Sequence, residues 1–178
     1  MSGTQPQKLL LKGKTAVFID YANVYGWRDE LVKPIDPKRL YKYLKTYPQI
    51  ESINFYYGSD NNPQSKKFLK ETKKIGYSLI TKPVKYITVG QIDSHFIRKR
   101  KCDFDIEICM GVYEALENNL STFIFFSGDG DFEPLYQYLI HKHKQVIVIY
   151  EQGHLGKEIW KIKRGLFKTR FTFLQYTK

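Results

Sequence analysis

At 178 residues, the chain is long enough to bury a full hydrophobic core and falls in the size range of one domain rather than two. Hydrophobic residues make up 42% and aromatic residues 16%, a composition that excludes a disordered chain. With 29 Lys and Arg against 18 Asp and Glu, the formal net charge of +11 favours a polyanionic partner, and a basic surface that only confers solubility stays open.

The N-terminal part predicts a buried strand followed by a helix. Residues 1–13 are expected to be a polar segment, and residues 14–178 a single domain. Thr15 to Asp20 predicts a strand covered on both faces, because its centre is continuously apolar. An Asp-Pro pair at residues 36–37 predicts the cap and first residue of a helix, which Pro48 ends.

A second strand, a second helix and a third strand follow. Ile50 to Tyr57 predicts the second strand, and an Asn-Pro pair at residues 62–63 begins a helix that Gly76 ends. Tyr77 to Thr81 predicts a short third strand. Val84 to His95 has no clear pattern, so an extended arm and a loop both stay open.

The second half of the chain continues the alternation of helix and strand. Helices are predicted near residues 103–118, 131–141 and 155–164, and strands at residues 122–126, 146–150 and 171–174. Such alternation is typical of parallel βαβ units, so we expect an α/β domain built on a parallel sheet.

The cysteines and the N-terminus bear on the cellular compartment. Cys102 and Cys109 form no CxxC pair and have no histidines at zinc-ligand spacing, so we expect buried or idle thiols in a reducing compartment. The polar start has no apolar stretch of signal-peptide length, and the longest apolar runs are strand-sized. We therefore expect a soluble, cytoplasmic protein without membrane association.

Two aspartates follow strands that can be neighbours in the sheet. Asp20 ends the first strand, and Asp129 follows the strand at residues 122–126 after a Ser-Gly turn. Sites in open α/β sheets form beyond the carboxyl ends of the strands, where the strand order reverses. If the order is 3-2-1-4-5, these two strands are adjacent and their distant carboxylates meet.

The helix near residues 103–118 contributes a third carboxylate. Its predicted core-facing stripe consists of Ile108, Cys109, Val112 and Leu116. Asp105 lies one turn before this stripe and therefore points inward, whereas Asp103 and Glu107 are expected at the solvated rim. Three roles of Asp131 stay open: a metal ligand, a supporting acid, or a favourable charge at a helix N-terminus.

Carboxylates that converge in one pocket repel each other unless a cation neutralises them or some are protonated. Mg²⁺ or Mn²⁺ is the natural partner, because these hard ions take oxygen ligands and retain several waters. Such an ion activates water and stabilises charge on phosphorus oxygens, so no Ser, Cys or His nucleophile is required. The predicted metal ligands are Asp20, Asp105, Asp129 and Asp131.

Three segments carry a recognisable order of residues: FIDYANV at residues 18–24, KCDFDIEI at residues 101–108 and SGDGDF at residues 127–132. They resemble the first motif, the central motif and the SGDxDF signature of NYN domains of the LabA-like branch, within the PIN-like nuclease group. The order and spacing of all three, over roughly residues 14–150, make the resemblance far more specific than any one motif.

The resemblance implies a three-layer, Rossmann-like (PIN-like) fold with sheet order 3-2-1-4-5 and helices on both faces. It also implies metal-dependent ribonuclease activity. The matched site positions are Asp20, Asn23, Asp105, Asp129 and Asp131. One position departs from the family pattern, since related sequences commonly have an Asp where this chain has Gly111. A site with one metal, an altered metal affinity and binding without cleavage all stay open.

Three residues near these carboxylates have alternative explanations. Asn23 either caps a short helix or orients a metal-bound water. Gly128 and Gly130 either permit a tight turn or let a phosphate or metal approach the backbone.

Two basic tracts are candidate RNA contacts. The first is Arg98, Lys99, Arg100 and Lys101, directly before the central motif; an ordinary solvated charge run is its alternative. The second comprises Lys157, Lys161, Lys163, Arg164, Lys168 and Arg170, with Trp160, Phe167 and Phe171 interleaved. Basic groups beside aromatic rings suit single-stranded RNA, with Lys161 and Arg164 as contacts, unless those rings belong to the core.

The leading hypothesis is an endoribonuclease dependent on Mg²⁺ or Mn²⁺, with Asp20, Asp105, Asp129 and Asn23 as catalytic residues and RNA, in single-stranded form, as partner. The alternative is a catalytically weak RNA-binding or regulatory module, for which Gly111 is the main support. Phosphatase chemistry of the haloacid dehalogenase type is disfavoured, because the residues after Asp20 lack the second Asp that its first motif needs. A homodimer stays open.

Overall fold

The computed structural model, which describes residues 7–31, 34–92, 95–174 and 176, is built on a six-stranded parallel sheet of order β3-β2-β1-β6-β7-β8. Its strands are β1 (Thr15–Asp20), β2 (Ile50–Ser59), β3 (Ser78–Pro83), β6 (Thr122–Phe126), β7 (Gln145–Tyr150) and β8 (Leu166–Arg170). Counted within this sheet alone, the strands have the expected order 3-2-1-4-5, and β8 extends it by a sixth strand.

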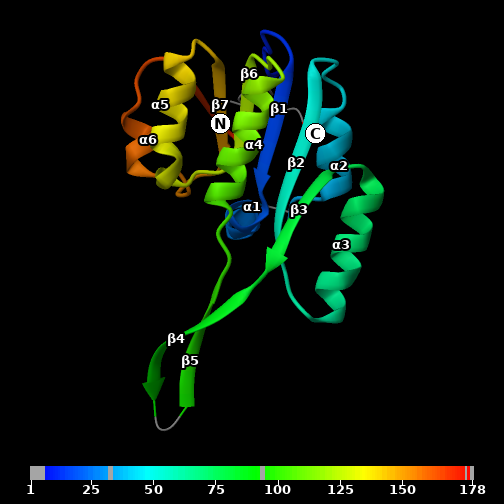
Figure 1. The fold of residues 1–178 in the computed structure, drawn as a ribbon, viewed down its shortest axis with the longest axis vertical. Helices are drawn as coiled ribbons and strands as arrows, with labels where there is room; N and C mark the ends of the chain where they lie inside the picture. Colours follow the sequence, from blue (N-terminus) through cyan, green and yellow to red (C-terminus); the bar gives the residue numbers. More distant parts are fainter. Residues whose placement is uncertain (1–6, 32–33, 93–94, 175, 177–178) are drawn as a thin grey trace, which may run out of the picture.

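Helices cover both faces of the sheet, as expected. They are α1 (Tyr21–Gly26), α2 (Pro37–Leu44), α3 (Pro63–Ile75), α4 (Asp105–Glu117), α5 (Glu133–His141) and α6 (Lys157–Lys161), with 3-10 turns η1 (Trp27–Asp29), η2 (Gly130–Phe132) and η3 (Phe171–Phe173). In Figure 1, α4, α5 and α6 lie on one side of the sheet and α2 and α3 on the other. Among the described helices, none has both the length and the apolar character needed to cross a membrane.

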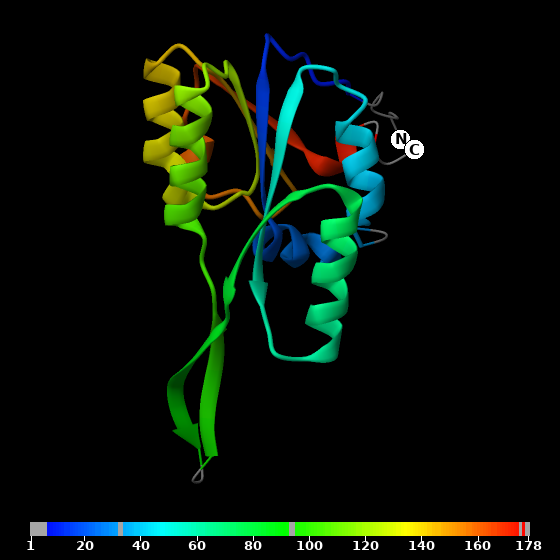
Figure 2. The ribbon, with the colours of Figure 1, turned by 45° about the vertical axis from the view of Figure 1, so that its right-hand side comes forward.

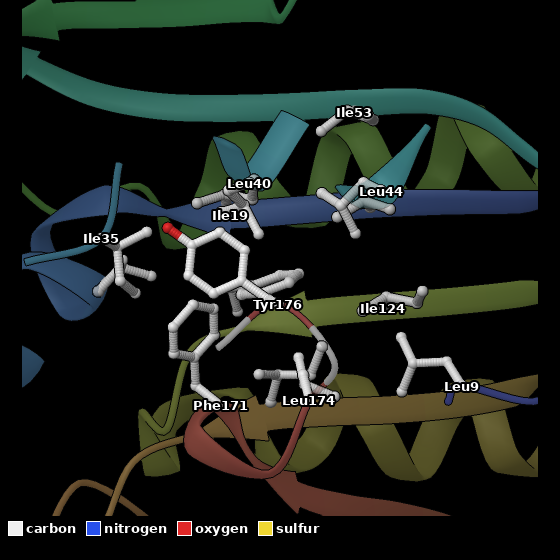
Figure 3. Packing of buried hydrophobic residues seen from close by; sticks show 14 of the residues in the cluster. Leu9, Ile19, Ile35, Leu40, Leu44, Ile53, Ile124, Phe171, Leu174 and Tyr176 are labelled. Atoms are coloured by element: carbon white, nitrogen blue, oxygen red, sulfur yellow. The ribbon is translucent and has the colours of Figure 1, made fainter. Parts of the chain in front are cut away.

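The central strand β1 is buried on both faces, which explains its continuous apolar sequence. Val17 and Ile19 belong to a core cluster with α2 and the C-terminal segment, part of which Figure 3 shows. Ala16 and Phe18 belong to a second cluster with α4, α5 and α6. Alternate side chains of β1 thus pack against the two layers of helices on opposite faces of the sheet.

The predicted helix starts are confirmed at α2 and α3. The Asp36 carboxylate accepts hydrogen bonds from the backbone N–H groups of Lys38 and Arg39. The Asn62 side chain accepts one from the Ser65 N–H at 2.7 Å. In both helices the capping residue is followed by proline at the first helical position, where no N–H is needed.

The C-terminal elements differ from the prediction. The closing strand is Leu166–Arg170, not residues 171–174, because Phe171 and Leu174 are buried in the first core cluster and form no ladder there. The last helix is also shorter than expected. The Lys168 ammonium donates hydrogen bonds to the carbonyls of Ile159, Trp160 and Ile162, and these bonds satisfy the carbonyl groups where α6 ends.

Part of the expected polar N-terminal segment packs on the domain. Gln7 forms an isolated parallel bridge with Leu174, and the Leu9 side chain is buried in the first core cluster. The Leu9 N–H donates to the Tyr47 hydroxyl at 3.1 Å. Residues 1–6 of that segment lie outside the described residues.

The segment left open in the sequence forms an extended arm. Strands β4 (Lys85–Ile92) and β5 (His95–Lys101) pair as an antiparallel hairpin outside the main sheet. Figures 1 and 2 show this hairpin projecting from the body, at the end toward which the arrowheads of β1 and β2 point. The first basic tract lies on β5, so it is carried away from the core and toward the carboxyl ends of the strands.

Candidate functional site

Asp20 and Asp129 lie at the same edge of the sheet. Asp20 is the last residue of β1, and Asp129 follows β6 after two residues. The two strands pair in parallel, with Ile19 opposite Phe126, so the chain leaves both strands side by side. Asp105 is the first residue of α4, whose buried residues Ile108 and Val112 pack over β1 in the second core cluster.

Both strand-end aspartates begin a helical turn. The Asp20 Oδ1 atom accepts hydrogen bonds from the Ala22 and Asn23 N–H groups at 3.1 and 3.3 Å. The Asp129 Oδ1 atom accepts one from the Asp131 N–H at 3.1 Å. Among the described residues neither Oδ2 atom has a hydrogen-bond donor. Each cap therefore fixes a carboxylate through one oxygen and leaves the other available to a ligand.

The three aspartates interact electrostatically. Burial raises the pKa of Asp20 from 3.8 to about 6; the nearby charges of Asp129 and Asp105 add to this, and the two backbone hydrogen bonds oppose it. Burial likewise raises the pKa of Asp105, followed in size by the effect of Asp129 and then of Asp103 and Asp131. The sequence prediction that these carboxylates meet in space is therefore consistent with the structure.

None of the three aspartates forms an ion pair with a described lysine or arginine, although the chain contains 29 such residues. Two neighbouring acids are paired, by contrast. Glu107 accepts from the Lys82 ammonium at 2.7 and 2.8 Å, and Asp103 lies 3.8 Å from the Lys101 ammonium. Asp103 is exposed, as expected, and Glu107 is partly exposed, with Lys82 on β3 as its ion-pair partner.

The donor chemistry of this edge fits a hard divalent cation, since three acidic side chains offer oxygen atoms and no competing ammonium group. The arrangement is nevertheless open. Within the described part of the chain, no three His, Cys, Asp or Glu side chains stand close enough together to hold a metal ion. Asp131, the fourth predicted ligand, is exposed on η2 at the outer side of the edge.

Asn23 has a role that the sequence did not predict. Asp20, not Asn23, caps α1. The Asn23 Oδ1 atom accepts hydrogen bonds from the Trp27 indole N–H and from the Gly128 backbone N–H, both at 3.1 Å. This oxygen therefore ties α1 to the loop that carries Asp129, and it holds the two strand-end aspartates in a fixed relation.

Gly128 and Gly130 are required by packing rather than by turn geometry, since neither is among the described glycines with positive φ. A Cβ atom on Gly128 would lie 1.5 Å from the His154 carbonyl oxygen. A Cβ atom on Gly130 would lie 2.5 Å from the Glu158 carboxylate. The Gly156 N–H also donates to the Gly128 carbonyl at 2.7 Å. The Asp129 loop is thus packed, backbone against backbone, on the segment that leads into α6.

Gly111 permits a close approach of α4 to the sheet. A Cβ atom at this position would lie 2.7 Å from the Tyr56 hydroxyl and 3.3 Å from the Phe18 ring. Tyr56 is buried on β2 and fills the space beside the helix. A side chain at position 111 would thus meet Tyr56 first, which gives a physical reason for glycine at this position.

Tyr136 belongs to the surroundings of the site, although no sequence pattern pointed to it. Its side chain is fully buried on α5, and its hydroxyl has no hydrogen-bond partner. Burial raises its pKa well above the usual value, with further contributions from the charges of Asp129 and Asp20. The hydroxyl is therefore buried where it senses the charge of both strand-end carboxylates. By contrast, Cys109, predicted in the core-facing stripe of α4, is exposed, and Ala115 is buried there instead.

The first basic tract lies beyond this edge on the hairpin, whereas the second leads away from it, because Leu166 pairs with Val146 at the amino end of β7. On β5, Lys99, Arg100 and Lys101 are exposed, and the Arg98 side chain lies outside what the structure describes. Lys161 and Arg164 are exposed at the end of α6, which follows the segment packed on the Asp129 loop.

The aromatic residues of the second tract divide between surface and core. Trp160 is 57% exposed and Phe167 47%, whereas Phe171 is buried. The ammonium groups of Lys163 and Lys168 lie 5.6 and 5.5 Å from the centre of the Trp160 ring. One aromatic ring of this tract is therefore a surface flanked by cations, as single-stranded RNA binding requires.

These features define a Rossmann-like α/β domain with an acidic site at the carboxyl ends of its parallel strands. The NYN domain model matches residues 14–161, so the chain belongs to the NYN domain family. NYN domains are a PIN-like nuclease family, and membership supports a nuclease-like function related to RNA.

Two known proteins extend this comparison. The chain is 27% identical, over 148 residues, to the low amplitude and bright protein LabA of Synechococcus elongatus, an alignment that covers 82% of this chain and 78% of that protein. A crystal structure of a protein of unknown function from Vibrio parahaemolyticus has a TM-score of 0.67 at 21% identity, covering 91% of this chain and 96% of that one. The second similarity concerns the fold alone.

Replacing Asp20 by asparagine is expected to stabilise the protein at neutral pH. The folded protein holds the Asp20 proton between pH 3.8 and about 6, so this contribution to stability is complete below pH 3.8 and is lost as the pH rises through about 6. The amide can still accept the capping hydrogen bonds. We expect Asp20→Asn to gain about 1–2 kcal/mol at pH 7.5 and little at pH 4, in urea unfolding with EDTA present. An equal gain at both pH values, or the same gain in Asp103→Asn, would contradict the burial of this charge.

Gly128→Ala is expected to destabilise the protein by about 3 kcal/mol, because the added methyl group overlaps a backbone carbonyl that cannot turn away. The matched control is Gly26→Ala, where the nearest atom, on the His154 ring, lies 3.9 Å from the added carbon. This control should be neutral or slightly stabilising. Denaturant titration of both variants measures the difference, and equal stabilities would show that the two loops do not pack as described.

Proposed function

We propose that this protein is a metal-dependent endoribonuclease that hydrolyses RNA phosphodiester bonds at Asp20, Asp105 and Asp129. The observation that carries the proposal is the set of mutually repelling carboxylates without an ion-pair partner among the described residues, at the sheet edge where sites of such folds form. Two neighbouring acids, Glu107 and Asp103, do pair with lysines.

In this proposal, the three aspartates hold Mg²⁺ or Mn²⁺, and Asp131 supports them from the outer side. PIN-like nuclease domains typically use divalent metals, and such an ion, when bound, activates water and stabilises charge on the phosphate. The protein's own contribution is to place the ligands. Asp20 and Asp129 are fixed through one oxygen each by backbone N–H groups, and Asn23 holds their two loops together.

RNA is the proposed substrate because exposed basic groups lie on the hairpin beyond the acidic edge and on the segment that leads away from this edge after α6. Lys99, Arg100 and Lys101 on the hairpin, and Lys161 and Arg164 after α6, are exposed and can contact phosphates. The exposed Trp160 ring favours a single strand, whose unpaired bases can stack on it. A cytoplasmic location stays a prediction from the sequence, and a homodimer stays open.

A catalytically weak RNA-binding module is the alternative, and two observations favour it. Gly111 stands where related sequences commonly have a further acid, and the described carboxylates do not already form a set close enough to hold a metal. This alternative keeps the basic tracts and loses only cleavage, so an assay that measures binding and cleavage separately distinguishes the two functions.

Cleavage of single-stranded RNA by the wild-type protein is expected to require Mg²⁺ or Mn²⁺ and to stop with EDTA. Asp20→Asn, Asp105→Asn and Asp129→Asn should each lower the rate at least about 100-fold, while RNA binding is retained. Asp131→Asn should have a smaller effect, about tenfold. The measurement is a single-turnover assay on a labelled oligonucleotide, with thermal unfolding to show that each variant folds.

The matched control for this series is Asp103→Asn, an exposed acid two residues before Asp105 that pairs with Lys101. It should cut RNA at the wild-type rate. Full binding without metal-dependent cleavage by the wild-type protein would favour the RNA-binding module instead. Cleavage that survives all three site variants would come from another site or a contaminant.

A further inference from the structure

A cavity of about 640 Å³ lies directly beside Asp20, between α1, the end of β2, the start of α3 and the root of the hairpin. Its lining includes Tyr21, Tyr25, Tyr57, Phe68, Asn62 and Arg100. A volume of this order is typical of sites for small organic groups. Among the residues that line this cavity, Arg100 alone belongs to a basic tract, and none belongs to the acidic edge.

The walls of the cavity are aromatic. The ring centres of Tyr21 and Phe68 lie 4.9 Å apart, those of Tyr57 and Phe68 4.8 Å, and those of Tyr21 and Tyr57 5.8 Å. Tyr25 continues this cluster outward, 6.1 Å from the Tyr21 ring, and is 55% exposed. A planar, apolar ligand can therefore stack against rings that are already held in place.

The opposite side of the cavity is polar and rigid. The Asp60 carboxylate accepts a hydrogen bond from the Tyr86 hydroxyl at 2.6 Å and lies 3.7 Å from the Arg100 guanidinium. Arg100 also donates to the Gly58 carbonyl at 3.1 Å. These contacts fasten the root of the hairpin to the loop after β2. The amide side chains of Asn62 and Gln64, which can both donate and accept, complete this side.

One residue joins this cavity to the acidic edge. Ala22 lines the cavity, and its N–H donates to the Asp20 carboxylate at 3.1 Å. Cations lie at the rim: Arg100 belongs to the first basic tract, and the Arg28 guanidinium lies 4.4 Å from the centre of the Tyr25 ring. A polyanion that crosses Asp20 can thus keep its charges near arginines while one attached planar group enters the cavity.

We propose that this cavity binds one nucleobase of the RNA strand whose backbone lies across Asp20, next to the phosphate that is cut. The inference rests on the proposed function for the identity of the strand, and on the cavity itself for the base. Stacking on tyrosine and phenylalanine tolerates every base, because each base has a π face. The Asn62 and Gln64 amides can hydrogen-bond a base edge and so favour particular bases at this position.

The test uses binding, without divalent metal, of short single-stranded RNAs with one 2-aminopurine, a fluorescent base that is quenched when it stacks. The wild-type protein should quench the probe strongly at one position of the oligonucleotide. Tyr25→Ala should abolish that quenching and weaken binding about tenfold, whereas Tyr25→Phe, which keeps the ring, should behave as wild type. Because Tyr25 is largely exposed, its removal leaves the core intact.

The matched control is Tyr138→Ala on α5, another exposed tyrosine with a cation, Lys142, over its ring at 5.6 Å. It should leave quenching unchanged. If Tyr25→Ala and Tyr138→Ala give the same result, or if no position is quenched, the proposal is overturned even where the protein cuts RNA.

Failure of the nuclease proposal gives a different pattern. Quenching that depends on Tyr25 without any cleavage supports the base site and removes only the catalytic function. Binding of adenosine monophosphate that depends on Tyr25, with no quenching of the oligonucleotides, would assign the cavity to a free nucleotide and overturn its role in RNA recognition.

Discussion

The parallel pairing of β1 with β6 is the constraint on which the candidate site depends. It places the ends of two strands, far apart in the sequence, side by side and brings Asp20 and Asp129 to one edge. Two core clusters bury opposite faces of β1, so a slip of one residue would exchange the side chains between the clusters. Core packing therefore fixes the position of the carboxylates, whose own interactions are repulsive.

The structure holds this repulsive arrangement with backbone groups rather than with cations. An ion pair to a lysine would neutralise a carboxylate and occupy its free oxygen. Backbone N–H groups at the start of α1 and η2 instead contact one oxygen of Asp20 and of Asp129. Lys82, which reaches toward this edge from β3, is paired with Glu107. The result is a set of acids that is positioned but not neutralised, as expected of a cation-binding site.

Signals that act over a few residues predicted much of the fold. Strand β1 and the caps at Asp36 and Asn62 follow from local patterns, and all appear in the structure. What the sequence could not predict depends on contacts between distant segments. The hydrogen bond from Gly128 to Asn23 and the packing of Gly128 on His154 are of this kind.

Local pattern also fails where two environments favour the same residues. Phe171 and Leu174 suit a strand as well as a core anchor, and only the docking of the C-terminal segment distinguishes the two.

The distribution of charge raises a separate question, since an acidic edge repels the phosphates that it is proposed to cut. Basic groups on the hairpin lie beyond that edge and can attract a strand toward it. In the proposed function, a divalent ion neutralises the charge of Asp20 and Asp129, so the phosphate at this edge is bound more tightly with the ion than without it. The same carboxylates would then weaken RNA binding at the edge without metal and strengthen it with metal.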